Sequence, residues 1–285
     1  MQANQRNSGG LREMKHLRLT GGLLAIAACP AFTSSVLAAD FTIQPRVSIG
    51  YQNYEFDLDV NNNFDVDTEY TFGGLGITGQ TGKFFIDLYG QTNLTDAEFD
   101  ENNFVVVDTI AVEREASIDR NELNLTLGYA FTPMITAFGG LKYAKNEIDQ
   151  EFNSNNALAD AIFANDFVNF ENEYIGPFVG AAFSIPVADI GSFSLNGSLA
   201  YLDGESTLDL VVQDLVVDDA SIDGTAIGYG VGATWSGRFA ALSSSLSSLG
   251  FSMGVDYSSY DFEDDGDDVY AERTLRVRTD LKYQF

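Results

Sequence analysis

Hydrophobic and polar residues alternate at every second position over most of the chain beyond residue 40. In the last segment, Leu275, Val277 and the alternate positions up to Phe285 are mostly apolar, whereas the residues between them are polar or charged. A period of two residues is typical of a β-strand with two different faces. The pattern predicts ten strands, over residues 41–51, 70–78, 84–94, 122–131, 135–143, 174–185, 193–201, 226–235, 250–257 and 274–285.

The links between these segments alternate in length and charge. Long and short connections that alternate along an antiparallel chain place the two kinds on opposite sides of a sheet, as in membrane-spanning barrels. An even number of strands then puts the N-terminus and the C-terminus of the barrel domain on the same side as the short turns. The long links are polar and mostly acidic (59–68, 100–119, 147–172, 202–223 and 261–268), and the others are generally shorter and less charged (80–83, 132–133, 186–191 and 237–249).

Aromatic residues occupy both ends of the apolar faces. Tyr201 ends one strand in one direction and Trp235 ends the next in the other. Two such rings are typical of the aromatic girdles at the two membrane boundaries. A soluble β-sandwich or barrel is the alternative, with its apolar face in a core and its polar face in water. The polar faces here are rich in Gly, Ser and Asn, which suits a confined interior better. We therefore expect an all-β, transmembrane, antiparallel up-and-down barrel of about ten strands, with eight or twelve as alternatives.

The N-terminal segment has the pattern of an export signal. A positive region after Met14 is followed by a short apolar run and by small residues before Ala39. This order predicts a start extension and a cleaved signal peptide over 1–39 and a barrel over 40–285. A lipoprotein-type cleavage that lipidates Cys29 is an alternative, which Pro30 disfavours.

Removal of residues 1–39 changes the chemistry that remains. It takes away four basic residues and one acidic residue, so the net charge goes from -27 to -30, and it removes the single Cys and the single His. The mature chain then has no thiolate, disulfide or histidine metal site. Its negative charge argues against nucleic acid as a partner.

The chain resembles the small outer-membrane β-barrels of Gram-negative bacteria, the class of the OmpA transmembrane domain and short porin-like proteins. The resemblance rests on the architecture and on the terminal signal Leu281, Tyr283 and Phe285. It implies insertion by the barrel assembly machinery into the outer membrane. We expect a monomer in contact with outer-membrane lipid and lipopolysaccharide. Barrel enzymes of this size resemble one another in requiring a histidine. We therefore expect no enzyme, and no catalytic or cofactor-binding residue.

The acidic link 261–268 is the one candidate metal site. Asp264, Asp265, Asp267 and Asp268 offer the carboxylate oxygens that Ca²⁺ prefers, but their spacing does not match an EF-hand loop. Looser divalent bridging to lipopolysaccharide phosphates is the interpretation that we favour.

Charged residues also fall on the inward faces of several strands. Buried charges need partners or water, so two arrangements are open. The charges pair across the lumen and plug it, or the glycines Gly228, Gly230, Gly232, Gly250 and Gly254 leave a hydrated bore. The expected lumen charges are Arg46, Asp256, Arg276, Arg278, Asp280 and Lys282.

These features lead to two functional hypotheses. The first is a structural barrel or a narrow passive channel, which the external acids would make cation-favouring. The alternative is a surface adhesin or ligand-binding barrel that acts through the acidic external loops 100–119, 147–172 and 202–223.

Overall fold

The computed structural model describes residues 41–58, 64–95, 97–101, 113–153, 167–187, 191–212, 215–239, 246–264 and 267–285. The signal-peptide prediction, Cys29 and Asp265 lie outside the described residues. No helix within these ranges is long and apolar enough to cross a membrane. The strands are β1 (Phe41–Leu58), β2 (Phe64–Thr81), β3 (Phe84–Asn93), β4 (Ala97–Glu101), β5 (Glu113–Ala130), β6 (Ile135–Asn153), β7 (Phe167–Val187), β8 (Gly191–Val212), β9 (Leu215–Arg238), β10 (Leu249–Asp264) and β11 (Asp267–Tyr283).

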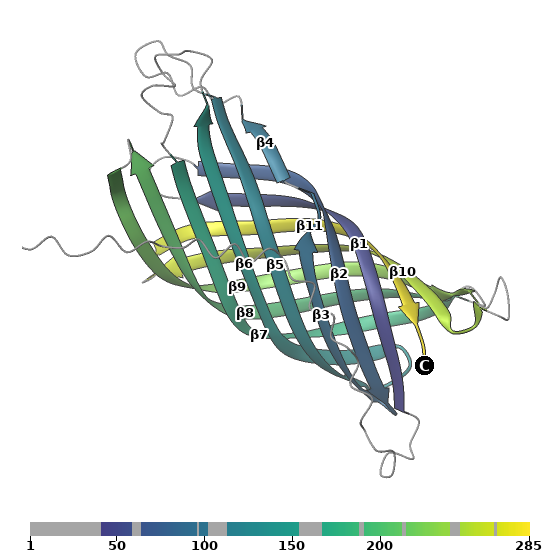
Figure 1. Ribbon diagram of the computed structural model, residues 1–285. Coiled ribbons are helices and arrows are strands. Elements are labelled where there is room, and N and C mark those ends of the chain that lie inside the picture. Colours follow the sequence, from purple (N-terminus) through teal and green to yellow (C-terminus); the bar gives the residue numbers. More distant parts are fainter. Residues whose placement is uncertain are drawn as a thin grey trace, which may run out of the picture. The chain divides into compact units, whose positions relative to one another are not determined.

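These strands form one closed antiparallel sheet (Figure 1). Each long strand pairs with its neighbours in sequence, β1 pairs with β11, and β3 pairs with β5. Closure leaves no unpaired edge in the membrane, where an unsatisfied backbone group is costly. The expected ten-strand up-and-down barrel is confirmed, because β3 and β4 together form a single interrupted strand beside β5.

The interruption between β3 and β4 lies where the wall leaves the apolar band, and Figure 1 shows β4 beyond the end of β3. The pairing register with β5 shifts by two residues across it, from Thr92↔Asn121 to Ala97↔Ile118. The side chain of Asn93 bridges the gap. Its Nδ2 donates to the carbonyl of Ile118 at 2.9 Å, and its Oδ1 accepts from the backbone N–H of Arg120 at 3.0 Å.

The outward face carries the apolar residues that the alternation predicts. Val47, Leu125 and Leu199 are examples, with more than a third of each side chain exposed. Such a large exposed apolar area is unusual on a soluble monomer and indicates contact with lipid. The band is bordered by aromatic side chains, including Tyr201 and Tyr283.

The strands extend further on the external side than the alternation predicts. In β8 the segment Leu202–Val212, which we expected to be a link, continues the strand for about 33 Å at roughly 3.3 Å per residue. In this extension the apolar residues are the ones that face inward, whereas within the membrane they are the ones that face outward. Leu202 and Phe262 are buried inside, whereas Asp203 and Asp261 are exposed outside. The change follows from the surroundings, because the outer face meets lipid below this level and water above it.

Candidate functional site

A buried cluster of charged side chains crosses the lumen and is centred on Arg120 of β5. Its Nη2 lies 2.6 Å from Glu272 Oε1 of β11 and 2.6 Å from Glu122 Oε1, and its Nη1 donates to Asn146 Oδ1 at 2.8 Å. The side chains of Arg120, Glu122 and Glu272 are at most 1% exposed. Tyr174 OH donates to Glu272 Oε1 at 3.0 Å. The guanidinium therefore joins strands on different sides of the barrel.

The same cluster continues toward the periplasmic side through Glu122. Arg276 Nη2 lies 3.4 Å from Glu122 Oε1, and Lys142 Nζ lies 3.7 Å from its Oε2. Arg276 also donates through Nη1 to Gln91 Oε1 at 2.9 Å. Three cations thus share two carboxylates. Most of the polar atoms have partners, as buried charges require.

A second polar cluster fills the lumen nearer the periplasm. Arg46 donates from both Nη atoms to the Asp87 carboxylate, at 2.5 and 2.8 Å. Asp280 accepts from the hydroxyls of Ser48 at 2.7 Å and Ser252 at 2.6 Å. Arg278 Nε lies 3.1 Å from Asp280 Oδ1. The two clusters together hold four of the six expected lumen charges.

The other two expected lumen charges lie at less crowded positions. Asp256 faces inward opposite Gly232, where its Oδ1 occupies the space that a Cβ would need. Lys282 lines a polar cavity of about 350 Å³ at the periplasmic mouth, together with Arg238, Gln44 and Gln284.

A layer of buried aromatic and aliphatic side chains packs against the charged cluster and extends from it toward the external side. Phe262 stacks on Tyr270 with ring centroids 4.2 Å apart, and Phe56 lies 4.9 Å from Phe170. The Arg120 guanidinium carbon lies 4.9 Å from the centre of the Tyr54 ring, which connects this layer to the charged cluster. The layer consists of Tyr54, Phe56, Tyr70, Phe72, Ile118, Ala144, Ile148, Phe170, Tyr174, Leu202, Ala226, Tyr260, Phe262 and Tyr270.

Inward glycines give room to these large side chains. The Tyr260 ring covers Gly228, and Ser198 Oγ would lie 2.9 Å from a Cβ at Gly230. Gly250 and Gly254 face mainly backbone and Thr234 at 3.0 Å or more. Side chains of the neighbouring strands therefore occupy the space beside Gly228, Gly230 and Gly232, and less so beside Gly250 and Gly254.

The sequence pattern does not single out Arg120, Lys142 or Asn146 as site residues. The sequence nevertheless contains a signal for Arg120. It lies two residues before Glu122, so in a strand that extends past residue 122 both side chains face inward. The predicted link ends at residue 119, because the apolar residues change there from the outward to the inward face and hide the strand. Which inward residues meet across the lumen depends on the pairing register, which no local pattern contains.

The external wall presents carboxylates around its outside, above the aromatic border. We call these residues the acidic collar. Lys145 and Arg273 are the cations on the same surface among the described side chains. The collar consists of Glu55, Asp57, Asp67, Glu69, Asp119, Glu147, Asp149, Glu171, Glu173, Asp203, Glu205, Asp223, Asp261 and Glu263.

The candidate calcium site is only partly described. Asp264 is exposed at the end of β10, and the side chains of Asp265, Asp267 and Asp268 lie outside the described residues. The described residues contain no group of three or more acidic, histidine or cysteine side chains that could hold a metal ion.

The terminal residues Leu281, Tyr283 and Phe285 all face outward. The backbone N–H of Phe285 donates to the Ile43 carbonyl at 3.1 Å, and the rings of Tyr283 and Phe285 lie 4.7 Å apart. The proposed assembly signal therefore lies on the closing seam between the last strand and β1.

Comparison with known proteins identifies the fold. No protein-family model matches the chain, and no curated protein matches it. Among solved structures, the outer membrane protease OmpT from Escherichia coli matches with a TM-score of 0.58 and 10% identity, over 87% of this chain and 98% of OmpT. The translocator domain of the autotransporter NalP from Neisseria meningitidis matches with a TM-score of 0.47 and 13% identity, over 85% of this chain and 88% of that domain.

The closed sheet, the apolar band and the OmpT match define an integral outer-membrane β-barrel of the Gram-negative type. The match also corrects our expectation that the protein is not an enzyme. A barrel of this architecture is the scaffold of a protease, so the fold does not exclude catalysis. At 10% identity the likeness extends to the fold alone and assigns no reaction to this chain.

Proposed function

We propose that this protein is a closed, non-conducting barrel that anchors its external strand wall in the outer membrane. The observation that carries the proposal is the buried cluster of Arg120, Glu122 and Glu272, which joins β5 to β11 across the lumen. A narrow passive channel would need a hydrated route past this cluster.

The energetics of the cluster support a permanent closure. Separating Arg120 from its carboxylates without solvating them would leave buried charges unpaired, at a cost of about 3–5 kcal/mol. The aromatic layer packs against the same cluster and extends toward the external side. An ion would have to displace both, and the interior of a ten-strand barrel is near the lower size limit, where side chains can fill it.

Planar-bilayer recording on the protein purified from outer membranes tests this proposal. We expect no defined conductance steps, with a general porin reconstituted in parallel as the positive control. Single-channel steps with cation preference would overturn the proposal and support the channel hypothesis.

A second candidate function is binding at the cell surface by the external wall. The specific observation in its favour is the length of β8 and β9 beyond the apolar band, which exceeds what crossing a membrane requires. The partner that the acidic collar fits is a layer of lipopolysaccharide phosphates bridged by divalent cations, since direct contact of like charges is repulsive.

Thermal unfolding in lipopolysaccharide-containing micelles tests this second candidate. We expect millimolar calcium to raise the midpoint in wild type, and to raise it less in a Glu171→Gln, Glu173→Gln, Asp203→Asn, Glu205→Gln variant. The same titration in micelles without lipopolysaccharide is the control. An equal calcium effect in both micelles, or none in either, would contradict the bridging.

A further inference from the structure

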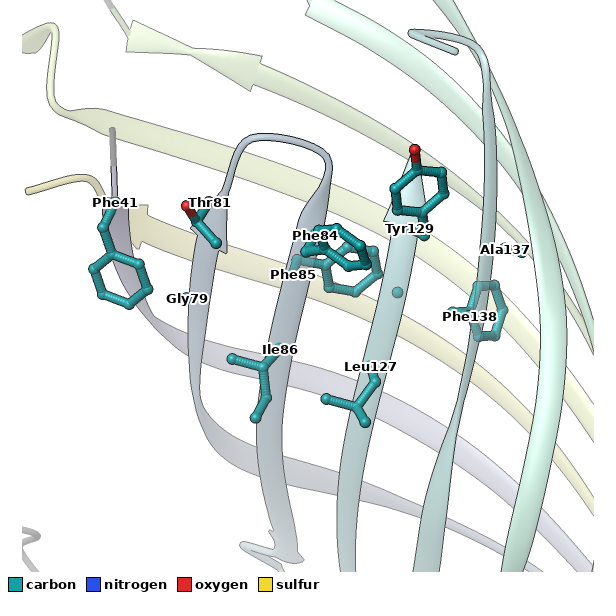
Figure 2. A pocket seen from close by; sticks show the side chains of 11 residues that line it. Phe41, Gly79, Thr81, Phe84, Phe85, Ile86, Leu127, Tyr129, Ala137 and Phe138 are labelled. Atoms are coloured by element: carbon teal, nitrogen blue, oxygen red, sulfur yellow. The ribbon is translucent and has the colours of Figure 1, made fainter. Parts of the chain in front are cut away.

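An apolar hollow of about 540 Å³ lies on the wall near the periplasmic turns (Figure 2). Four strands and the start of β1 contribute to it, and its size is in the range of small-molecule sites. Part of its depth arises at Ala137, which carries only a methyl group between larger neighbours, whereas Phe41 and Ile86 close over Gly79. The larger lining residues are Phe41, Phe84, Phe85, Ile86, Leu127, Tyr129 and Phe138.

Most of this lining belongs to the outward, lipid-facing phase of the strands. Phe41, Ile86 and Leu127 are about half exposed and belong to the outward-facing apolar band. The hollow is therefore continuous with the hydrocarbon-facing surface, and the group that occupies it must be apolar and come from the bilayer.

Polar groups lie at the periplasmic end of the hollow. Lys83 is exposed in the turn after β2, and its Nζ lies 5.9 Å from the centre of the Tyr129 ring, which lines the hollow. The same Nζ donates to the Phe131 carbonyl at 3.2 Å. Thr81 contributes a hydroxyl to the lining. An ammonium and a hydroxyl beside an apolar groove match a phosphate attached to an acyl chain.

The distribution of charge over the described residues restricts which lipid fits. From the aromatic border to the periplasmic turns, the side-chain carboxylates are Asp87, Glu122, Asp256 and Asp280, and all four face the lumen. No described side-chain carboxylate therefore repels an anion from the outside of this part of the wall. The acidic collar on the external side has the opposite character.

We propose that the hollow binds an anionic phospholipid of the periplasmic leaflet, with one acyl chain over Ala137 and the phosphate beside Lys83 and Thr81. The acyl chain fills a groove that the annular lipids would otherwise leave poorly packed. The cation adds preference for a negatively charged headgroup.

Native mass spectrometry of the protein purified from outer membranes in mild detergent tests the proposal. The delipidated protein is titrated with phosphatidylglycerol and with phosphatidylcholine of identical acyl chains. We expect tighter binding of phosphatidylglycerol, and a loss of about fivefold in that preference in Lys83→Gln, the size of one exposed ion pair. Arg238→Gln is the matched control, because Arg238 lies at the same rim but lines the lumen-side cavity.

A second variant tests the apolar part of the site. Ala137→Leu fills the hollow and should weaken the binding of both lipids. Ala233→Leu, at an outward position of β9, should leave the binding of both lipids unchanged. Equal binding of the two lipids by wild type would overturn the headgroup assignment. So would a preference for phosphatidylglycerol that is the same in Lys83→Gln and in Arg238→Gln. Unaltered binding in Ala137→Leu would overturn the acyl-chain site.

Discussion

Gly228 of β9 lies directly opposite Tyr260 of β10, and the Tyr260 ring occupies the space that a side chain at Gly228 would need. The same relationship recurs across the barrel. Gly50 lies opposite Phe72, and Gly128 lies opposite Phe85. Pairs of this kind explain why a chain so rich in glycine has a filled interior, since each missing side chain admits a ring from the next strand.

Replacement of Gly228 by alanine should destabilise the barrel by about 1–3 kcal/mol, because the added Cβ overlaps the Tyr260 ring in a packed interior. Urea unfolding of refolded protein, followed by tryptophan fluorescence, measures the change. Gly197→Ala is the control, since the nearest atom to its added Cβ is 3.9 Å away. A double variant with Tyr260→Ala should lose less stability than the sum of the single variants. Equal effects of Gly228→Ala and Gly197→Ala would contradict the packing that we describe.

Replacement of Arg120 by methionine should cost about 3–5 kcal/mol, because it leaves Glu122 and Glu272 buried without their shared cation. The matched control is Arg273→Gln. Arg273 pairs with Glu55 at 3.9 Å with both side chains more than 40% exposed, so its loss should cost less than about 1 kcal/mol. The unfolding free energy in urea distinguishes the two. Addition of Glu272→Gln to Arg120→Met should recover part of the loss, and a further loss would show that the carboxylate has other cationic partners.

Replacement of Asn93 by alanine should loosen the wall at the interruption between β3 and β4. The amide of Asn93 satisfies the Ile118 carbonyl and the Arg120 N–H where the regular ladder is broken. Loss of these bonds leaves two backbone groups of β5 without that partner. Hydrogen–deuterium exchange should become faster at residues 118–120. Asn53→Ala, which removes an exposed contact with Asp67, is the control, and equal exchange in both variants would refute a special role of Asn93.

Deletion of Phe285 should reduce insertion in cells while leaving the refolded barrel almost as stable as wild type. Phe285 contributes one backbone bond to Ile43 and is 75% exposed, so it adds little to the fold itself. The folded fraction in outer membranes, scored by heat-modifiable migration in gels, reports assembly. Urea unfolding in detergent reports stability. If the deletion variant reached the wild-type level of folded protein in the outer membrane, the assembly role that we assign to the terminal aromatic residue would be wrong.

The alternation along the chain is enough to predict the class of fold. Alternation with a period of two is a local property of the sequence. Lipid surrounds the barrel, so within the apolar band the outward-facing residues are apolar in every strand. Residues such as Leu125, Leu199 and Val277 therefore revealed the strands and their lipid-facing side without knowledge of any partner. The same alternation placed Arg276, Arg278 and Asp280 on the inward side.

The ends of the strands and the contacts between inward side chains follow only from the folded barrel. Above the membrane, the apolar phase moves to the inward residues, as at Leu202 and Phe262, and this change hid the external extensions of the strands. The pairing of Arg120 with Glu272 joins residues 152 positions apart. Such a contact depends on the register of every strand between them, because closure of the barrel sets which inward residues share a level.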